Sequence, residues 1–205
     1  MKNFFISQRG SLLTLLVLIL LPFLVGLFNG ASPADVLVNG NGQSKFIQGL
    51  AIEIFILTIY ALSFDVIFGI TGLLSFGHSM FFAVGAYLTG IAIKSFGLSL
   101  PATLGWLVVA SVVQALLFGL VLPRVKGITF ALVTLGLRSV FHILVMSSDF
   151  GEYTGADVGL QGVIVPAFIS PATERLCFYF MALTVMVLIY LLYQRFVNSP
   201  TGRVC

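Results

Sequence analysis

The chain has 205 residues, of which 59 % are hydrophobic and 8 % are charged, and its formal net charge is +3. So few polar residues cannot cover a soluble globule, and no basic cluster with interleaved aromatic residues indicates a nucleic-acid surface. The composition therefore predicts an all-α, polytopic transmembrane helix bundle, because a helix satisfies its backbone hydrogen bonds within its own segment.

Six apolar stretches follow one another along the chain, and about 20 apolar residues in a helix cross a hydrocarbon core of about 30 Å. A cleaved signal peptide is the alternative for the first stretch, which follows a basic start. Its apolar run is long for a signal peptide and no typical cleavage site follows it, so we expect a retained helix. The predicted spans cover residues 12–28, 46–64, 80–93, 102–122, 128–146 and 176–193.

The basic residues outside these spans predict their orientation, because cytoplasmic segments of membrane proteins carry an excess of lysine and arginine. With a cytoplasmic N-terminus, six basic residues fall on the cytoplasmic side and three fall outside. The reverse orientation would invert this bias, so we expect the N-terminus in the cytoplasm. The six are Lys2, Arg9, Arg124, Lys126, Arg195 and Arg203, and the three are Lys45, Lys94 and Arg175.

A glycine-rich stretch between the second and third predicted spans interrupts the apolar pattern. Each glycine in a helix costs about 1 kcal/mol relative to alanine, so a continuous helix is not expected there. One interpretation is a broken or re-entrant element that lines a pathway, since irregular backbone at membrane depth needs shelter from protein or from a water-filled cavity. The other is an ordinary cytoplasmic turn whose glycines permit close helix packing. The residues concerned are Gly69, Gly72, Ser75, Gly77 and His78.

The fifth predicted span carries a polar stripe, in which Thr134, Arg138 and His142 follow one another at steps of four residues. An arginine in mid-bilayer costs about 2.5–3.5 kcal/mol on the insertion scale, so this stripe should face protein or water. Glu53 also lies inside a span, and a Glu53–Arg138 ion pair is one hypothesis. The alternative is that Arg138 snorkels or meets water in a vestibule. His142 is either a helix-packing residue or part of a proton relay.

The sequence contains no catalytic or metal-binding pattern. The two histidines lie far apart, no HExxH motif or nucleophile elbow occurs, and no Walker A lysine motif is present. The two cysteines, Cys177 and Cys205, have no ligand spacing. We therefore expect a protein that is not an enzyme, has no catalytic residues, binds no cofactor or metal, and lacks an ATPase site of its own.

Four segments in chain order resemble one known family. Residues 69–78, Gly-Ile-Thr-Gly-Leu-Leu-Ser-Phe-Gly-His, resemble its Gly-x-x-Gly-x-x-Ser-x-Gly-His signature. Residues 127–136 resemble the segment that precedes the central helix of the family. Residues 154–163 are similar to an external Thr-Gly-Gly-x-Asp-Gly-Leu-x-Gly loop, and residues 199–203 to the start of a cytoplasmic Ser-x-x-Gly-Arg segment. The family is the branched-chain amino-acid type of ABC importer permeases. Its LivM-like branch, which includes urea and short-chain amide permeases, is the most similar.

Two features of this chain depart from the family pattern. The family commonly carries an acid and an arginine near positions 139 and 142, where this chain has Ser139 and His142. In relatives, the segment after the Gly-Arg pair continues into a coupling helix that docks on the ATPase, and further spans follow. We therefore expect residues 1–205 to form a single transmembrane permease domain that lacks the C-terminal part of the family domain.

The resemblance implies a permease subunit of the bacterial inner membrane that forms a translocation path for branched-chain amino acids, urea or an amide. Its implied partners are two cytoplasmic ATPase subunits, a second permease subunit and an extracytoplasmic solute-binding protein. Candidate path residues are Gly69, Gly72, Ser75, Gly77, His78, Glu53, Thr134, Arg138 and His142. Candidate contacts of the binding protein are Asp149, Glu152 and Asp157, and the ATPase-coupling segment would start at Gly202 and Arg203.

Two other functional classes compete with this assignment. The broken element and the charges inside spans would suit a stand-alone ion-coupled carrier or channel, but a carrier built from inverted repeats should show two matching halves, and one break is found. A membrane enzyme is disfavoured because no acid–base pair or metal set is present.

Overall fold

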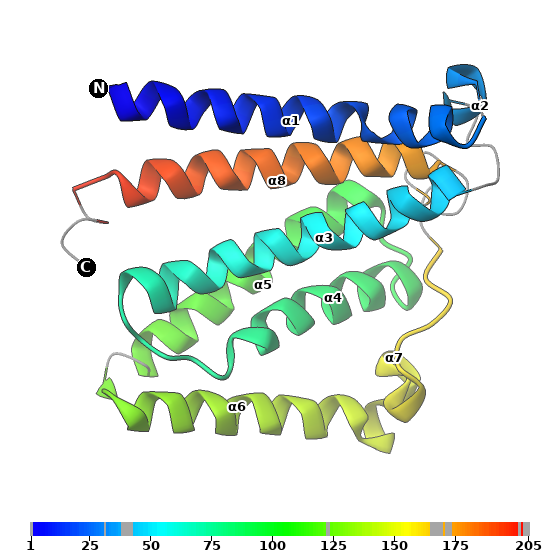
Figure 1. The fold of residues 1–205 in the computed structure, drawn as a ribbon. Helices are drawn as coiled ribbons and strands as arrows, with labels where there is room; N and C mark the ends of the chain where they lie inside the picture. The colour runs from blue at the N-terminus through cyan, green and yellow to red at the C-terminus, as the bar shows by residue number, and fades with distance from the viewer. Residues whose placement is uncertain are drawn as a thin grey trace. The chain divides into compact units, whose positions relative to one another are not determined.

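A computed structural model describes residues 2–30, 32–37, 43–121, 124–164, 170, 174–200 and 202. Most of these residues are helical, and no strand occurs among them, which confirms the all-α prediction (Figure 1). The long helices are α1 (Lys2–Phe28), α3 (Gln43–Asp65), α4 (His78–Lys94), α5 (Leu100–Val121), α6 (Ile128–Met146) and α8 (Arg175–Val197).

Each predicted span lies in one of these helices, except that the last residue of the span 102–122 lies outside the described residues. Five helices, namely α1, α3, α5, α6 and α8, contain segments long and apolar enough to cross a membrane. The remaining predicted span is α4, whose 17 residues extend about 26 Å at 1.5 Å per residue. This helix is shorter than the about 20 residues that cross a hydrocarbon core, because the chain between α3 and α4 does not continue as α-helix.

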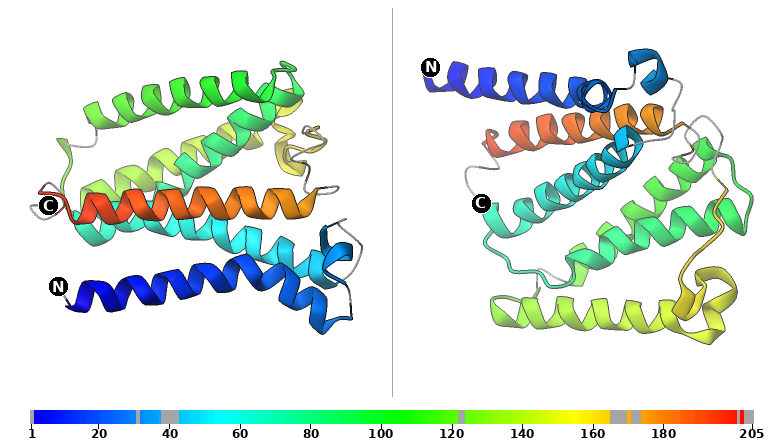
Figure 2. Two further views of the ribbon diagram at one scale, coloured as in Figure 1. Left: turned by 90° about the horizontal axis from the view of Figure 1, so that it is seen from above. Right: turned by 45° about the vertical axis from the view of Figure 1, so that its right-hand side comes forward.

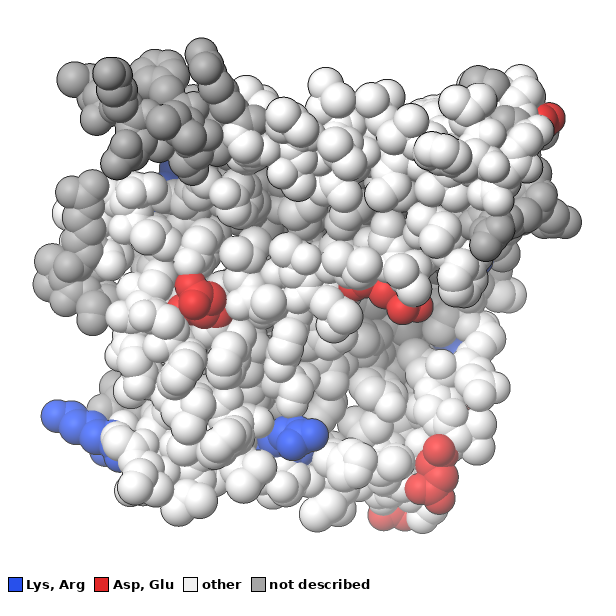
Figure 3. All heavy atoms as spheres, viewed as in Figure 1, with Lys and Arg blue, Asp and Glu red and all other residues white. Residues whose placement is uncertain are grey.

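The surfaces of these helices are largely apolar and exposed. In α5, for example, 6 % of the apolar segment is buried inside the protein. Charged side chains are sparse and scattered on the face that Figure 3 shows. Water would not tolerate so much contiguous apolar surface, whereas lipid and neighbouring membrane helices match it. The chain is therefore a multi-pass membrane protein.

The chain divides into two compact units, of which the first comprises Met1–Ile59 and Pro166–Leu192. It contains α1, the short helix α2 (Pro33–Leu37), and most of α3 and α8. Within it α1 and α8 lie side by side (Figures 1 and 2). Leu15 and Leu18 of α1 pack against a core that α3 and α8 share. This core consists of Ala51, Ile52, Phe55, Tyr179 and Leu183.

A proline in α1 determines how α1 and α8 are joined. Pro22 has no N–H, so the carbonyl of Leu18, four residues earlier, lacks its helical donor. The Tyr179 hydroxyl of α8 donates a hydrogen bond of 2.5 Å to this carbonyl. The Tyr179 ring also makes an edge contact with Phe55 of α3, with 5.2 Å between centroids. One tyrosine thus satisfies the polar group that the proline leaves free and connects three helices.

The loop after α1 carries a small capped helix. The backbone N–H and the hydroxyl of Ser32 donate to Asp35 Oδ2 at 2.9 and 2.8 Å, and the Asp35 N–H donates back to Ser32 Oγ at 3.2 Å. This reciprocal arrangement is that of a capping box, with Pro33 at the first helical position. The side-chain and backbone hydrogen bonds from Ser32 lower the pKa of Asp35 below its ordinary value.

The second unit comprises Tyr60–Val165 and Tyr193–Cys205. It contains α4, α5, α6 and the short helices η3 (Ser148–Phe150), α7 (Gly151–Thr154) and η4 (Ala156–Val158). Although short, α4 packs against α5, α6 and α7. Phe81 of α4 contacts Phe118 of α5 with 4.9 Å between ring centroids, and Tyr87 contacts Phe141 of α6 at 6.4 Å.

Candidate functional site

The glycine-rich stretch begins with a wide helical turn. After α3, Val66–Ile70 form a π-helix, η1, and π-helical turns are frequent at functional sites. Gly72, with φ +69°, ends it. The N–H of Gly72 donates to the Phe68 carbonyl at 3.1 Å, and the N–H of Leu73 donates to the Ile67 carbonyl at 3.2 Å. These nested bonds are typical of a helix end capped by a left-handed glycine, so the helix is interrupted here.

The second half of this stretch is buried against α6. The N–H of Phe76 donates to Thr134 Oγ1 at 3.2 Å, and the Thr134 hydroxyl donates to the Ala131 carbonyl at 2.9 Å. A Cβ at Gly77 would lie 2.4 Å from the Thr134 carbonyl oxygen. Ser75 and Thr134 are 5 % and 2 % exposed. The two backbones therefore meet at a distance that only glycine permits.

His78 closes the interruption by connecting the start of α4 to the end of α3. Its Nε2 lies 2.8 Å from Ser63 Oγ, whose hydroxyl donates to the Tyr60 carbonyl at 2.7 Å. Because a hydroxyl has one proton, the histidine Nε2 must carry the proton of the Ser63–His78 bond. The rings of Tyr60, Phe64 and Phe81 surround the imidazole. Its Nδ1 is buried and has no hydrogen-bond partner among the described residues.

The position of Thr134 places the interruption along α6. Thr134 lies six residues after Ile128, which is about 9 Å along the helix axis. The buried part of the stretch is therefore beside the second turn of α6 and not beyond the end of that helix. Ser75, Gly77 and His78 are buried, whereas Leu73, Leu74 and Phe76 are exposed, so both interpretations of this stretch remain predictions.

The residues of the predicted polar stripe on α6 do not share one environment in the structure. Thr134 is buried, whereas Arg138 and His142 are exposed. Steps of four residues turn about 40° further round an α-helix than a full circle, so the later residues leave the face that Thr134 occupies. Glu53 is exposed on α3 in the first unit, and Arg138 belongs to the second. Their hypothetical ion pair remains a prediction.

The predicted external acids lie on a compactly folded loop. Asp149 is in η3, Glu152 in α7 and Asp157 in η4, and all three are exposed. Beneath them the buried Thr154 hydroxyl donates to the Val145 carbonyl of α6 at 2.8 Å. The N–H of Ala156 donates to the same hydroxyl oxygen at 3.2 Å.

Two glycines permit close contacts, one within this loop and one between the loop and α4. Gly155 has φ +79°, and a Cβ there would lie 2.1 Å from the Gly159 carbonyl oxygen. A Cβ at Gly90 of α4 would lie 1.9 Å from Leu160 Cδ2, so the leucine side chain sits on the bare backbone of that helix. The loop therefore presents its three carboxylates from a fixed base.

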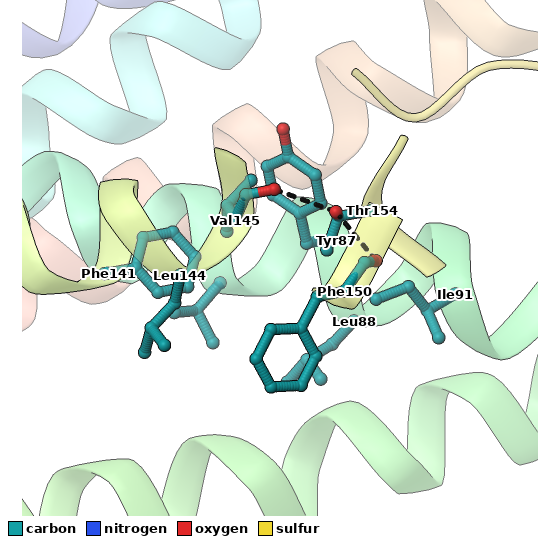
Figure 4. A pocket seen from close by; sticks show the side chains of 9 residues that line it. Tyr87, Leu88, Ile91, Phe141, Leu144, Val145, Phe150 and Thr154 are labelled. Atoms are coloured by element: carbon teal, nitrogen blue, oxygen red, sulfur yellow. Dashed lines mark hydrogen bonds between the residues drawn. The ribbon is translucent and has the colours of Figure 1, made fainter. Parts of the chain in front are cut away.

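The loop, α4 and α6 also enclose an apolar pocket of about 230 Å³ (Figure 4). The Thr154 hydroxyl at its edge is already engaged with the Val145 carbonyl, as the dashed line shows. No charged side chain lines the pocket, so it can take an aliphatic or aromatic group but has nothing to hold a zwitterion. Its lining residues are Val84, Tyr87, Leu88, Ile91, Phe141, Leu144, Val145, Phe150 and Thr154.

The predicted coupling segment starts directly after α8. The N–H of Gly202 donates to Ser199 Oγ at 3.2 Å, and the Ser199 hydroxyl donates to the Phe196 carbonyl at 2.6 Å. A Cβ at Gly202 would lie 2.3 Å from the Phe196 carbonyl oxygen. The chain thus folds back on the last turn of α8. Arg203 lies outside the described residues.

The sequence gives no indication of two groups in this region, Ser63 and Tyr193. Ser63 gives no motif signal, since its importance comes from the bond to His78 across the interruption. Asp65 and Tyr193 form a hydrogen bond although 128 residues separate them in the chain. From its place beside the glycine-rich stretch, Asp65 can cap or pair there or lie in interfacial water, and nothing in the sequence indicates Tyr193 as its partner. No cluster of three or more His, Cys, Asp or Glu suitable for a metal occurs in the described part of the chain.

Comparison with known proteins adds independent information. The model of a family described as "Branched-chain amino acid transport system / permease component" matches residues 46–205. Two similar curated proteins are the high-affinity branched-chain amino acid transport system permease proteins LivM of Salmonella typhimurium and Escherichia coli. Each is 25 % identical over 169 residues. The alignments cover 71 % of this chain and 39 % of each relative, so the chain spans about two fifths of their length. No solved structure matches significantly.

Proposed function

Since this chain belongs to the family of branched-chain amino acid transport system permease components, we propose that it is a permease subunit of an ABC importer. It would form part of the path for branched-chain amino acids or for a related small polar solute such as urea or a short amide. The observation that carries this assignment is the family match over residues 46–205, a range that contains the interrupted segment.

The path would run along the interrupted segment. Ser75, Gly77 and His78 are buried there, and Thr134 lies directly against Gly77. Irregular backbone leaves peptide groups that can hydrogen-bond a polar solute, which regular helices do not offer. Gly72, whose φ is positive, would serve as a hinge of this segment, and Gly69 would lie beside the path. Glu53, Arg138 and His142 are exposed in the isolated chain and would need cover from protein or water inside the bilayer.

The proposed partners are those that membership of this family implies, placed on the sides of the membrane that the basic residues favour. A second permease subunit would cover part of the apolar surface, and a solute-binding protein outside the cell would meet Asp149, Glu152 and Asp157. Two cytoplasmic ATPase subunits would meet the segment that starts at Gly202 and Arg203. The chain would contribute no ATPase site, and closure of the ATPase dimer would expose the path alternately to each side. The N-terminus would be cytoplasmic, in a bacterial inner membrane.

Co-purification from membranes tests this assignment against a stand-alone carrier or channel. The full-length permease, expressed with its neighbouring genes, should retain two ATPase subunits and a second permease. A permease that is purified alone and transports solute in vesicles without ATP would contradict the proposal.

The external loop offers a second test with a matched control. Asn and Gln in place of Asp149, Glu152 and Asp157 keep the shape of these exposed side chains and remove their charge. If the loop contacts the binding protein, the triple variant should bind it several-fold more weakly at low salt, and the difference should shrink at high salt. Neutralising Glu174, which lies at the end of the same connection but outside η3, α7 and η4, is the control.

A further inference from the structure

The carboxylate of Asp65 connects the interrupted segment to the end of α8. Asp65 is the last residue of α3 before η1, and Tyr193 lies in the last two turns of α8. The Tyr193 hydroxyl donates a short hydrogen bond to Asp65 Oδ2. Both residues belong to the second compact unit, so this contact lies within one body of the structure.

Gly69 makes room for this carboxylate. A Cβ at Gly69 would lie 2.2 Å from Asp65 Oδ1 and 2.8 Å from its Cγ, and real side chains do not tolerate such contacts. Gly69 does not have a positive φ, in contrast to Gly72, so backbone freedom is not the reason for a glycine here. The missing side chain and the hydrogen bond are independent observations, and both fix Asp65 between η1 and α8.

The end of α8 is rigidly attached to the segment that follows it. The turn formed by Phe196, Ser199 and Gly202 is held by three hydrogen bonds and by the close approach of Gly202 to the Phe196 carbonyl. A displacement of residues 199–202 would therefore move the last turns of α8, including Tyr193.

Residues on both sides of the interruption are held by other groups. Ser63, two residues before Asp65 on α3, is bonded to His78, and the backbone of Phe76 is bonded to Thr134 of α6. With Ser63 and Phe76 both held, a pull on Asp65 acts on the residues between them, which are η1 and the irregular chain up to Ser75. A movement of the end of α8 is therefore taken up by a π-helical turn and a stretch outside any α-helix.

We propose that the Asp65–Tyr193 hydrogen bond is a positioning link that transmits displacement of the end of α8 to the interrupted segment. Gly69 is required because any larger residue would push the carboxylate away from Tyr193. Neither Asp65 nor Tyr193 needs to touch the solute. The inference rests on the proposed function, in which the segment that meets the ATPase subunits starts at Gly202 and Arg203, at the end of this turn.

The test uses the full-length permease assembled with its partners in proteoliposomes. A cysteine replaces the buried Ser75 as a reporter, and Cys177 and Cys205 are changed to serine. The thiol-labelling rate of Ser75→Cys should change when ATP and vanadate are added. Tyr193→Phe removes only the donor hydroxyl, so this nucleotide effect should disappear while ATP hydrolysis continues. The solute carried per ATP should fall about tenfold, as expected for a lost hydrogen bond to a charged group.

Two further variants separate a positioning role from a general loss of stability. Asp65→Asn keeps an acceptor oxygen and should retain part of the nucleotide effect. Gly69→Ala should reproduce Tyr193→Phe, and the double variant should be no worse than either single change, because both break the same link. The control is Thr184→Val, which removes an α8 hydroxyl that bonds the Phe180 carbonyl of its own helix.

The link and the proposed function can fail separately. A Tyr193→Phe complex with an unchanged nucleotide effect, or additive effects of Gly69→Ala and Tyr193→Phe, would overturn the link. If the native protein binds no ATPase, the proposed function is wrong. The link is then tested without nucleotide. The Ser75→Cys thiol should be labelled several-fold faster in the Tyr193→Phe background than in the Thr184→Val control. Equal rates would overturn it.

Discussion

Glycine occupies three nearby positions in the sequence for three different physical reasons. Gly72 supplies a left-handed backbone that ends a π-helical turn, with φ +69°. Gly69 leaves space for the Asp65 carboxylate, and Gly77 lets the chain touch the backbone of α6 at Thr134. Sequence spacing marks all three as unusual in a helix but does not distinguish the reasons, because each depends on what lies opposite.

Gly77→Ala should destabilise the protein. The added Cβ would meet the Thr134 carbonyl oxygen, which belongs to the backbone of α6 and cannot rotate away, so we expect a loss of about 1–3 kcal/mol. Thermal unfolding in detergent, followed by fluorescence or by loss of the monodisperse species, measures it.

The matched control is Gly85→Ala in α4, where a Cβ would meet nothing within 4 Å. A helical alanine is favoured over glycine by about 1 kcal/mol, so this variant should be as stable as the native protein or more stable. If Gly77→Ala behaved like Gly85→Ala, the close approach to Thr134 would be refuted.

At the scale of helices, irregularities determine how elements meet. Pro22 frees a carbonyl in α1 that α8 then uses through Tyr179, and η1 ends α3 where Tyr193 of α8 reaches Asp65. In α1 the break itself frees the carbonyl that α8 uses, and at the end of α3 the side chain next to the break accepts the bond from α8. Hydrogen bonds between helices therefore add to the van der Waals packing of their apolar faces.

Tyr179→Phe tests the contact at the proline. The Leu18 carbonyl would lose its donor, and we expect a destabilisation of about 1 kcal/mol, as is typical of hydrogen bonds between membrane helices. Thermal unfolding of the purified protein measures the change.

A double-mutant cycle makes the test specific. Pro22→Ala restores an N–H to α1, so the Leu18 carbonyl has its own donor and Tyr179→Phe should cost less in that background. Equal costs in both backgrounds would show that the tyrosine hydroxyl does not compensate for the proline.

At the scale of the molecule, the apolar surface requires lipid or partners around it. The family match and the five helices of sufficient length and apolarity establish a multi-pass membrane protein. Orientation depends on the unequal distribution of basic residues, six against three with a cytoplasmic N-terminus.

Cysteine labelling tests this orientation. In a variant without Cys177 and Cys205, a membrane-impermeant thiol reagent should label a cysteine at the exposed Ser148 in intact spheroplasts. A cysteine at Val125, next to Arg124 and Lys126, should be labelled only after the membrane is opened. The reverse pattern would place the N-terminus outside.

The class of the protein, its all-α architecture, its long helical segments and its family can be predicted from the amino-acid sequence. These depend on apolar length and on local glycine patterns, which can be read without knowing what lies nearby. The bounds of α6 agree with its prediction at both ends, and α4 begins two residues before its predicted start.

Which polar residues contact one another is seen in the folded chain and not in its sequence. Thr134 lies against Gly77 while Arg138 points away from that face, and Asp65 pairs with Tyr193 across 128 residues. The physical reason is that a hydrogen bond or a close backbone contact depends on separations of a few ångströms. Those separations depend on how helices distant in the chain pack, and the local sequence at either partner does not specify that packing.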